Sequence, residues 1–130
     1  MSLAKSSWIA LSVALAVGAV SQASFAAEQV ILAMPQIVAT ESRAMDSGSR
    51  NKFGGCYASF PDNTITLSGC NSRYVTFACD GSSSISKSQA KLMFDNATLA
   101  YVLDTNVKIR VTDQINLDGL CTALNSQVAR

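Results

Sequence analysis

The sequence contains no histidine, and this absence removes the side chain that most often serves as a general base and as a neutral metal ligand. It has only 2 prolines, and its serines and carboxylates form no recognisable pattern of nucleophile and base. We therefore expect a non-enzymatic protein without catalytic residues, a resident metal or a cofactor.

Charged residues are also scarce, at 15% of the chain, and neither sign dominates. Ten basic residues face nine acidic residues, for a net charge of +1. Proteins that hold nucleic acid or anionic membranes by bulk electrostatics carry a much larger positive charge. We expect neither kind of partner.

The first 26 residues predict a secretory signal peptide. Lys5 gives a positive start, residues 8–20 are apolar, and Ser24-Phe25-Ala26 supplies the small residues of a cleavage site. A retained membrane anchor is the alternative, but the apolar run is short for a membrane span. We expect a secreted or periplasmic protein, with no membrane span after signal removal and a single disulfide-bonded domain over residues 27–130.

Four cysteines follow the signal peptide: Cys56, Cys70, Cys79 and Cys121. An even number of cysteines in a small exported domain predicts a disulfide framework. A zinc site is the rival interpretation, but zinc motifs favour closely spaced cysteine pairs. Four cysteines allow three pairings. We favour Cys56–Cys70 and Cys79–Cys121, because the segment between Cys56 and Cys70 has the pattern of a hairpin.

Residues 86–104 predict a helix. Ser86 and Gln89 fit a capping box at its start, and strong helix formers follow without glycine or proline. A step of about 100° per residue divides the apolar side chains between two opposite faces. One face holds Ala90, Met93, Phe94, Ala97, Ala100 and Tyr101, and the other holds Leu92, Leu99, Val102 and Leu103.

A helix on the surface of a monomer usually has one apolar stripe. We expect the alanine-rich face to pack on the chain's own sheet. The face with Leu92, Leu99 and Leu103 then becomes the expected interface of a homo-oligomer. The alternative is a helix buried on both sides within one domain, and a chain this short has little material for that.

Short apolar or alternating segments between turn residues predict the strands. Pro35 separates the first two of them, and a polar loop covers residues 41–52. Residues 65–68 are expected to return antiparallel to residues 53–60. The result is an α+β fold, mainly antiparallel β: a small OB-like barrel with one helix between the third or fourth strand and the last two strands. The predicted strands are residues 30–32, 37–39, 53–60, 65–68, 74–79, 107–111 and 120–124.

Several of these segments resemble known exported proteins. Residues 36–40 (QIVAT), 55–58 (GCYA), 74–77 (YVTF) and 105–111 (TNVKIRV) resemble the binding subunit of subtilase-type A–B toxins. The block from residue 75 to residue 121 is more similar still to small exported bacterial proteins of unassigned function.

The toxin resemblance implies an OB-like fold, a ring of five subunits and binding to sialylated glycans. The chain departs from the toxin subunit in its last segment, LCTALNSQVAR, which ends sooner and has another cysteine layout. The sugar-contacting residues of the toxin subunit match no positions here, so none is carried over.

Three sets of side chains are candidates for a catalytic or binding role. Aspartates at turns and on the helix flank offer carboxylates for acid–base work, but caps and solvation explain aspartate at such places better. Asp113, Asn116 and Asp118 alternate in a way that suggests calcium, without the glycine and distal glutamate of an EF-hand loop. Tyr57, Tyr74 and Tyr101 are candidates to stack on a sugar if exposed. The aspartates are Asp80, Asp95, Asp104, Asp113 and Asp118.

The sequence thus favours a small secreted or periplasmic binding domain, with a cell-surface glycan or a secreted protein as its partner. An oligomeric, glycan-binding subunit similar to a toxin B subunit is the specific form of this hypothesis. The alternative is a small exported hydrolase or inhibitor whose site the sequence does not reveal.

Overall fold

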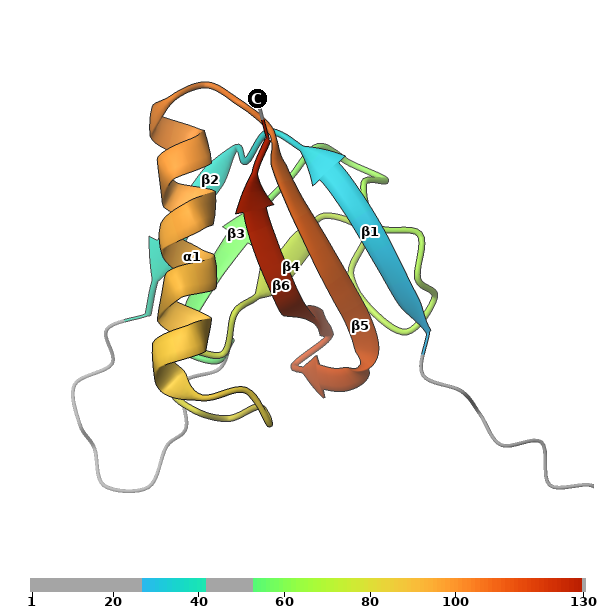
Figure 1. Ribbon diagram of the computed structural model, residues 1–130. Coiled ribbons are helices and arrows are strands. Elements are labelled where there is room, and N and C mark those ends of the chain that lie inside the picture. The colour runs from blue at the N-terminus through green and yellow to red at the C-terminus, as the bar shows by residue number, and fades with distance from the viewer. Residues whose placement is uncertain (1–26, 42–52, 130) are drawn as a thin grey trace, which may run out of the picture.

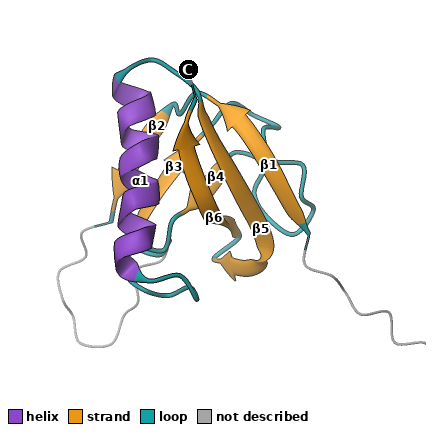
Figure 2. Ribbon diagram, viewed as in Figure 1, coloured by secondary structure: helices purple, strands orange, loops and turns teal. Residues whose placement is uncertain are grey.

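The computed structural model describes residues 27–41 and 53–129. Four strands come first: β1 (Glu28–Ala33), β2 (Ile37–Thr40), β3 (Cys56–Ser59) and β4 (Tyr74–Thr76). The helix α1 (Lys87–Val102) follows, and the long strands β5 (Val107–Leu117) and β6 (Leu120–Val128) complete the fold. Figure 2 shows this mainly β architecture, with α1 standing on one side of the strands. The expected α+β class, with the helix before the last two strands, is confirmed.

The six strands form one mixed sheet in the order β1-β5-β6-β4-β3-β2. Four of its five pairings are antiparallel, and β4 and β6 are parallel. The two edge strands, β1 and β2, are consecutive in the chain and are joined at one end of the sheet (Figure 1). Within the described residues no pairing joins β1 to β2, so the sheet is not closed into the expected barrel.

The core lies between the concave side of the sheet and α1. Alternate residues of the central strands point inward, so Val75, Ile109 and Val111 are fully buried. Phe77 packs edge-on against Phe94 of the helix, with ring centroids 5.6 Å apart. The alternation of Val107–Val111 therefore predicted its buried face correctly.

The helix begins as the sequence predicts. Ser86 is the N-cap, and its Oγ accepts a hydrogen bond from the Gln89 backbone N–H at 3.3 Å. The alanine-rich face packs on the sheet: Ala90, Met93, Ala97 and Ala100 are buried, and Phe94 is half-buried. Tyr101 was expected on that face but is 44% exposed. It lies in the last turn at the edge of the buried stripe, next to the fully buried Ala100.

The helix ends in a Schellman motif. The N–H of Asp104 donates to Tyr101 O (3.3 Å), and the N–H of Thr105 donates to Ala100 O (3.0 Å). This geometry places Asp104 in the left-handed region, with φ of 49°. Glycine is the usual residue there, because an L side chain is strained in that conformation.

Residues 65–68 do not form the expected strand, and β3 pairs with β4 instead. Ile65 is buried in the core, and its N–H donates to Ser72 O (2.8 Å) within the same loop. The Gln29 side chain ties this loop to β1 by donating to Thr64 O (3.0 Å) and accepting from Thr66 N (2.8 Å). The alternation of Ile65 and Leu67 thus reflects a loop that packs on the core rather than a strand.

The strands predicted over residues 107–111 and 120–124 are longer in the structure, because β5 continues to Leu117 and β6 runs from Leu120 to Val128. The turn between them consists of Asp118 and Gly119, with φ of 53° and 88°. Positive φ at both central residues is typical of the type I′ hairpin turn, for which Asp-Gly is a preferred pair. Asp118-Gly119 is therefore the local sequence signal for this hairpin.

All four cysteines form disulfides, as expected, but the favoured pairing is wrong. The bridges are Cys56–Cys79, with Cα atoms 5.6 Å apart, and Cys70–Cys121, with Cα atoms 5.2 Å apart. The antiparallel β3–β4 pair brings the residues after Thr76 alongside Cys56, and left-handed Ala78 (φ 55°) turns the chain toward it. The error followed from assigning the hairpin partner of β3 to the wrong segment.

The predicted signal peptide, residues 1–26, lies outside the described residues, as does most of the polar loop, residues 42–52. In the part of the chain that is described, no helix has the length and apolar character needed to cross a membrane.

The helix terminus gives a stability prediction. Asp104→Gly should raise the free energy of unfolding by about 1 kcal/mol, because glycine relieves the left-handed strain and a negative charge leaves the helix C-terminus. Urea unfolding measures the difference. Asp104→Asn removes only the charge and should give a smaller gain. A glycine variant no more stable than the asparagine variant would contradict the strain argument.

The disulfide framework gives a chemical prediction. Peptide mapping of the purified protein without reduction should recover a Cys56–Cys79 and a Cys70–Cys121 peptide. Each bridge limits the unfolded chain and should contribute on the order of 3 kcal/mol. A Cys56–Cys70 peptide, or free thiols in the native protein, would show that the pairing is wrong.

Candidate functional site

A pocket of about 380 Å³ opens on the convex face of the sheet, opposite the helix. Three aromatic side chains line it: Phe53, just before β3, Tyr57 of β3 and Tyr74 of β4. Asn71, Asp118 and Leu120 complete the lining. The lining side chains therefore come from three strands, β3, β4 and β6, and from the turns next to them.

Strand alternation explains why the two tyrosines share this face. Tyr57 pairs with Thr76, and Tyr74 pairs with Ser59, so the tyrosines are diagonal neighbours across the β3–β4 ladder. The residues between them, Ala58 and Val75, point into the core and are fully buried. Both tyrosines are half-buried and remain partly open to solvent.

The aromatic rings contact one another edge to face. The ring centroids of Phe53 and Tyr57 are 5.5 Å apart, and those of Tyr57 and Tyr74 are 6.3 Å apart. Arg73 supports the other side of Tyr74, with Cζ 5.3 Å from the ring centroid. Its guanidinium also pairs with Asp62 Oδ1 (3.2 Å) and donates to Gln36 Oε1 (3.3 Å). The ring of Tyr74 is therefore held from two sides.

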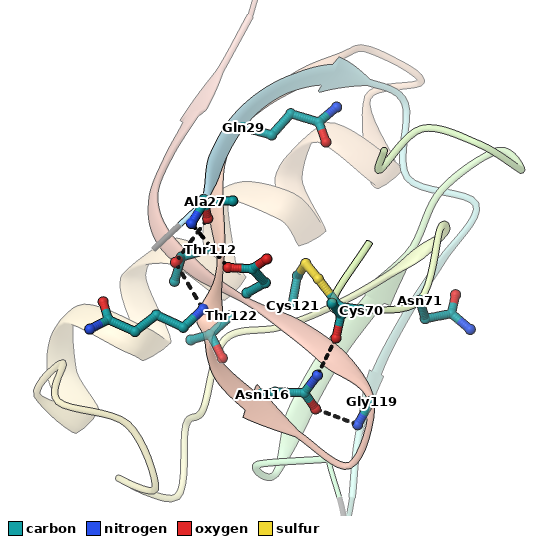
Figure 3. The surroundings of a disulfide bond; sticks show 12 residues. Ala27, Gln29, Cys70, Asn71, Thr112, Asn116, Gly119, Cys121 and Thr122 are labelled. Atoms are coloured by element: carbon teal, nitrogen blue, oxygen red, sulfur yellow. Dashed lines mark hydrogen bonds between the residues drawn. A yellow bond between two sulfur atoms is a disulfide. The ribbon is translucent and has the colours of Figure 1, made fainter. Parts of the chain in front are cut away.

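The polar rim of the pocket is built where the β5–β6 turn meets the loop before β4. The N–H of Asn71 donates to Gly119 O at 2.7 Å. Asn116 accepts from the Gly119 N–H (2.6 Å) and donates to Gly69 O (2.5 Å). Figure 3 shows the two Asn116 contacts beside the Cys70–Cys121 disulfide. The turn that carries Asp118 and the loop that carries Asn71 are thus linked.

A larger pocket, of about 490 Å³, lies between α1 and the β2–β3 edge. It is lined by the Cys56–Cys79 bridge, Lys87, Lys91, Phe94 and Asp95, among others. Lys91 and Asp95 face each other at 3.7 Å along the helix. Phe94 is the one aromatic side chain among the described residues that line this pocket, so the aromatic pocket is the stronger candidate for a sugar.

The three tyrosines named from the sequence are divided by the structure. Tyr57 and Tyr74 meet in the aromatic pocket, whereas Tyr101 lies on α1, outside the pocket lining. Sequence reasoning missed Phe53, Asn71 and Leu120. The Asp118-Gly119 pair was the available signal, since a tight hairpin there ends β5 and starts β6 next to β4.

Two of the acidic candidates, Asp80 and Asp113, have structural roles. Asp80 Oδ1 accepts from Ser82 N (2.9 Å), and Asp113 Oδ1 accepts from Ala27 N (3.1 Å). Asn116, one of the suggested calcium ligands, makes hydrogen bonds to backbone groups with both its amide oxygen and its amide nitrogen. Within residues 27–41 and 53–129, no three acidic or cysteine side chains cluster as a metal would require.

The predicted interface residues lie on the outer face of α1. Leu92 is 64% exposed, Leu99 48% and Leu103 59%. The face away from the sheet is therefore apolar and open in the single chain, and the oligomer itself stays a prediction.

Comparison with known proteins adds no relative: no family model matches the sequence, and no curated protein and no solved structure matches the chain.

Proposed function

We propose that this protein is an exported, non-enzymatic carbohydrate-binding domain whose sugar site is the aromatic pocket. The observation that carries the proposal is the pair of half-buried tyrosines, Tyr57 and Tyr74, held edge to face on the convex side of the sheet. The apolar C–H face of a sugar ring packs on such rings, while its hydroxyls need hydrogen-bonding groups around the edge.

The rim supplies those groups. Asn71 offers an amide that both donates and accepts, and Asp118 offers carboxylate oxygens that accept from hydroxyls. Both side chains are exposed, so a ligand can reach them. An apolar floor with a few convergent polar groups is the usual composition of a small-molecule site.

An exported hydrolase is the second candidate. Glycoside hydrolysis generally uses two carboxyl groups on opposite sides of the scissile bond. Among the described residues that line the aromatic pocket, Asp118 is the one carboxylate. This composition favours binding over cleavage.

The proposal includes an OB-like organisation of the sheet. In this interpretation β1 and β2 are two halves of one first strand broken at Pro35, each pairing with a different neighbour. The parallel β4–β6 pair and the helix before β5 support it. OB folds bind sugars and oligonucleotides across their central strands and adjacent loops, and the aromatic pocket occupies the corresponding strands β3 and β4.

Export and assembly complete the proposal. Two disulfides in a small domain fit an oxidising compartment. We further propose a homo-oligomer in which the outer faces of α1 meet through Leu92, Leu99 and Leu103. Exposed rows of large apolar side chains are unusual on a monomer, and an oligomer would present several sugar sites at once, which raises avidity.

The first test is a glycan array, followed by titration of the best-binding sugar. Tyr57→Ala and Tyr74→Ala should each weaken binding by about tenfold or more, because each removes one aromatic surface from the sugar. Tyr101→Ala removes the same side chain from an exposed place on α1 and should leave affinity unchanged.

Unfolding midpoints of the three variants establish that the loss is not a loss of fold. Equal sugar affinities in all three variants would contradict the assignment of the sugar site to the aromatic pocket. Cleavage of an oligosaccharide that is abolished by Asp118→Asn would replace the binding function with the hydrolase.

The second test concerns assembly. Leu99→Asp should dissociate the homo-oligomer in light scattering, because a charge in an apolar interface is costly to bury. Tyr101→Asp places the same charge near the same helix end but on another side, and should leave the mass unchanged. The toxin resemblance implies an oligomer of five subunits. Light scattering that shows the unmodified protein to be a monomer at micromolar concentration would contradict the interface proposal.

A further inference from the structure

We propose that Asn116 is the positioning residue of the sugar site. Its hydrogen bonds hold the Asp118–Gly119 turn against the loop that carries Asn71. This arrangement determines which configurations of the sugar hydroxyls the site binds. This inference rests on the proposed carbohydrate function. It adds that the ligand is selected by the arrangement of its ring hydroxyls, and that a residue outside the pocket lining controls this selection.

The Asn116 side chain makes two hydrogen bonds that connect the turn and the loop. Its Oδ1 accepts from the Gly119 N–H at 2.6 Å, and its Nδ2 donates to Gly69 O at 2.5 Å. One amide therefore joins two segments 50 residues apart in the chain, Gly69 and Gly119. The Asn71 N–H adds a third contact by donating to Gly119 O at 2.7 Å.

Other constraints act on the turn and on the loop that Asn116 connects. Asp118 and Gly119 both have positive φ, so the turn has few alternative conformations that keep β5 and β6 paired. On the other side, Cys70 is fixed to Cys121 at the start of β6. The Cys70–Cys121 bridge and the Asn71–Gly119 hydrogen bond already join the loop to the start of β6, and the Asn116 side chain adds a third tie, which also caps the turn.

Hydroxyl selection has to come from this rim. Stacking on Tyr57 and Tyr74 is broadly tolerant, because most pyranoses present some apolar C–H surface. Hydrogen-bonding groups discriminate strongly only when they are held in place, since a misplaced partner leaves polar groups unpaired. Loosening the rim should therefore reduce the ratio of affinities among different sugars by a larger factor than it reduces the affinity that comes from stacking.

The test uses the methyl glycosides of glucose, galactose and mannose, because galactose and mannose each differ from glucose in the configuration of one ring hydroxyl. Affinities are measured by titration calorimetry for the intact exported protein and for Asn116→Ala. The intact protein should prefer one of the three by about tenfold or more, and Asn116→Ala should reduce that preference to about twofold or less. A general loss of folded protein would lower all three affinities by the same factor and leave their ratio unchanged.

Two further variants keep the test decisive. Gln114→Ala truncates an exposed side chain two residues earlier on β5 and should leave the preference intact. Asn116→Asp keeps the acceptor for Gly119 N–H but loses the donor to Gly69 O, and should also lower the preference while the turn stays capped. It therefore replaces Asn116→Ala if the alanine variant fails to fold.

The outcomes separate the two proposals. If the intact protein binds the glycosides without preference, or if both Asn116 variants keep its preference, the positioning role is overturned and the sugar-binding function stands. If the intact protein binds none of the three glycosides and no sugar on the array, both proposals fall.

Discussion

The shortness of the link between β1 and β2 constrains the whole molecule. Ala33 and Ile37 are four Cα steps apart, which reach at most about 14 Å. The two strands are the opposite edges of a six-stranded sheet, and five strand spacings of about 4.8 Å would separate them by roughly 24 Å if the sheet were flat. The sheet must therefore curl, and the curl creates a concave side for the core and α1 and a convex side for the aromatic pocket.

The proposed site depends on this curl and on the disulfides. Curling places Ala58 and Val75 in the core and turns Tyr57 and Tyr74 outward on adjacent strands. The parallel β4–β6 pair then brings the β5–β6 turn next to the start of β4, where the Cys70–Cys121 bridge holds the preceding loop. A domain of this size has a small core, so covalent and hydrogen-bonded ties carry a larger share of its stability.

Local sequence signals predicted the local structure well. The Ser86 cap, the buried alanine face of α1 and the alternation of β5 all follow from spacing and residue type alone. The errors arose where a distant contact decided the outcome. The Ile65–Leu67 pattern suits a strand, but Gln29 holds it as a loop, and the wrong hairpin then led to the wrong cysteine pairing. Tyr57 and Tyr74 could be named from the sequence, but Asn71 and Asn116 become visible only once β4 and β6 are known to be parallel neighbours.

The central claim is that sugar occupies the convex face over β3 and β4. Amide chemical-shift mapping of the ¹⁵N-labelled protein, during titration with the sugar preferred on a glycan array, tests this claim residue by residue. The account predicts that the largest changes fall on Tyr57, Asn71, Tyr74 and Gly119, while the amides of α1 stay still. Changes centred on Lys87 and Lys91, at the pocket beside α1, would contradict it.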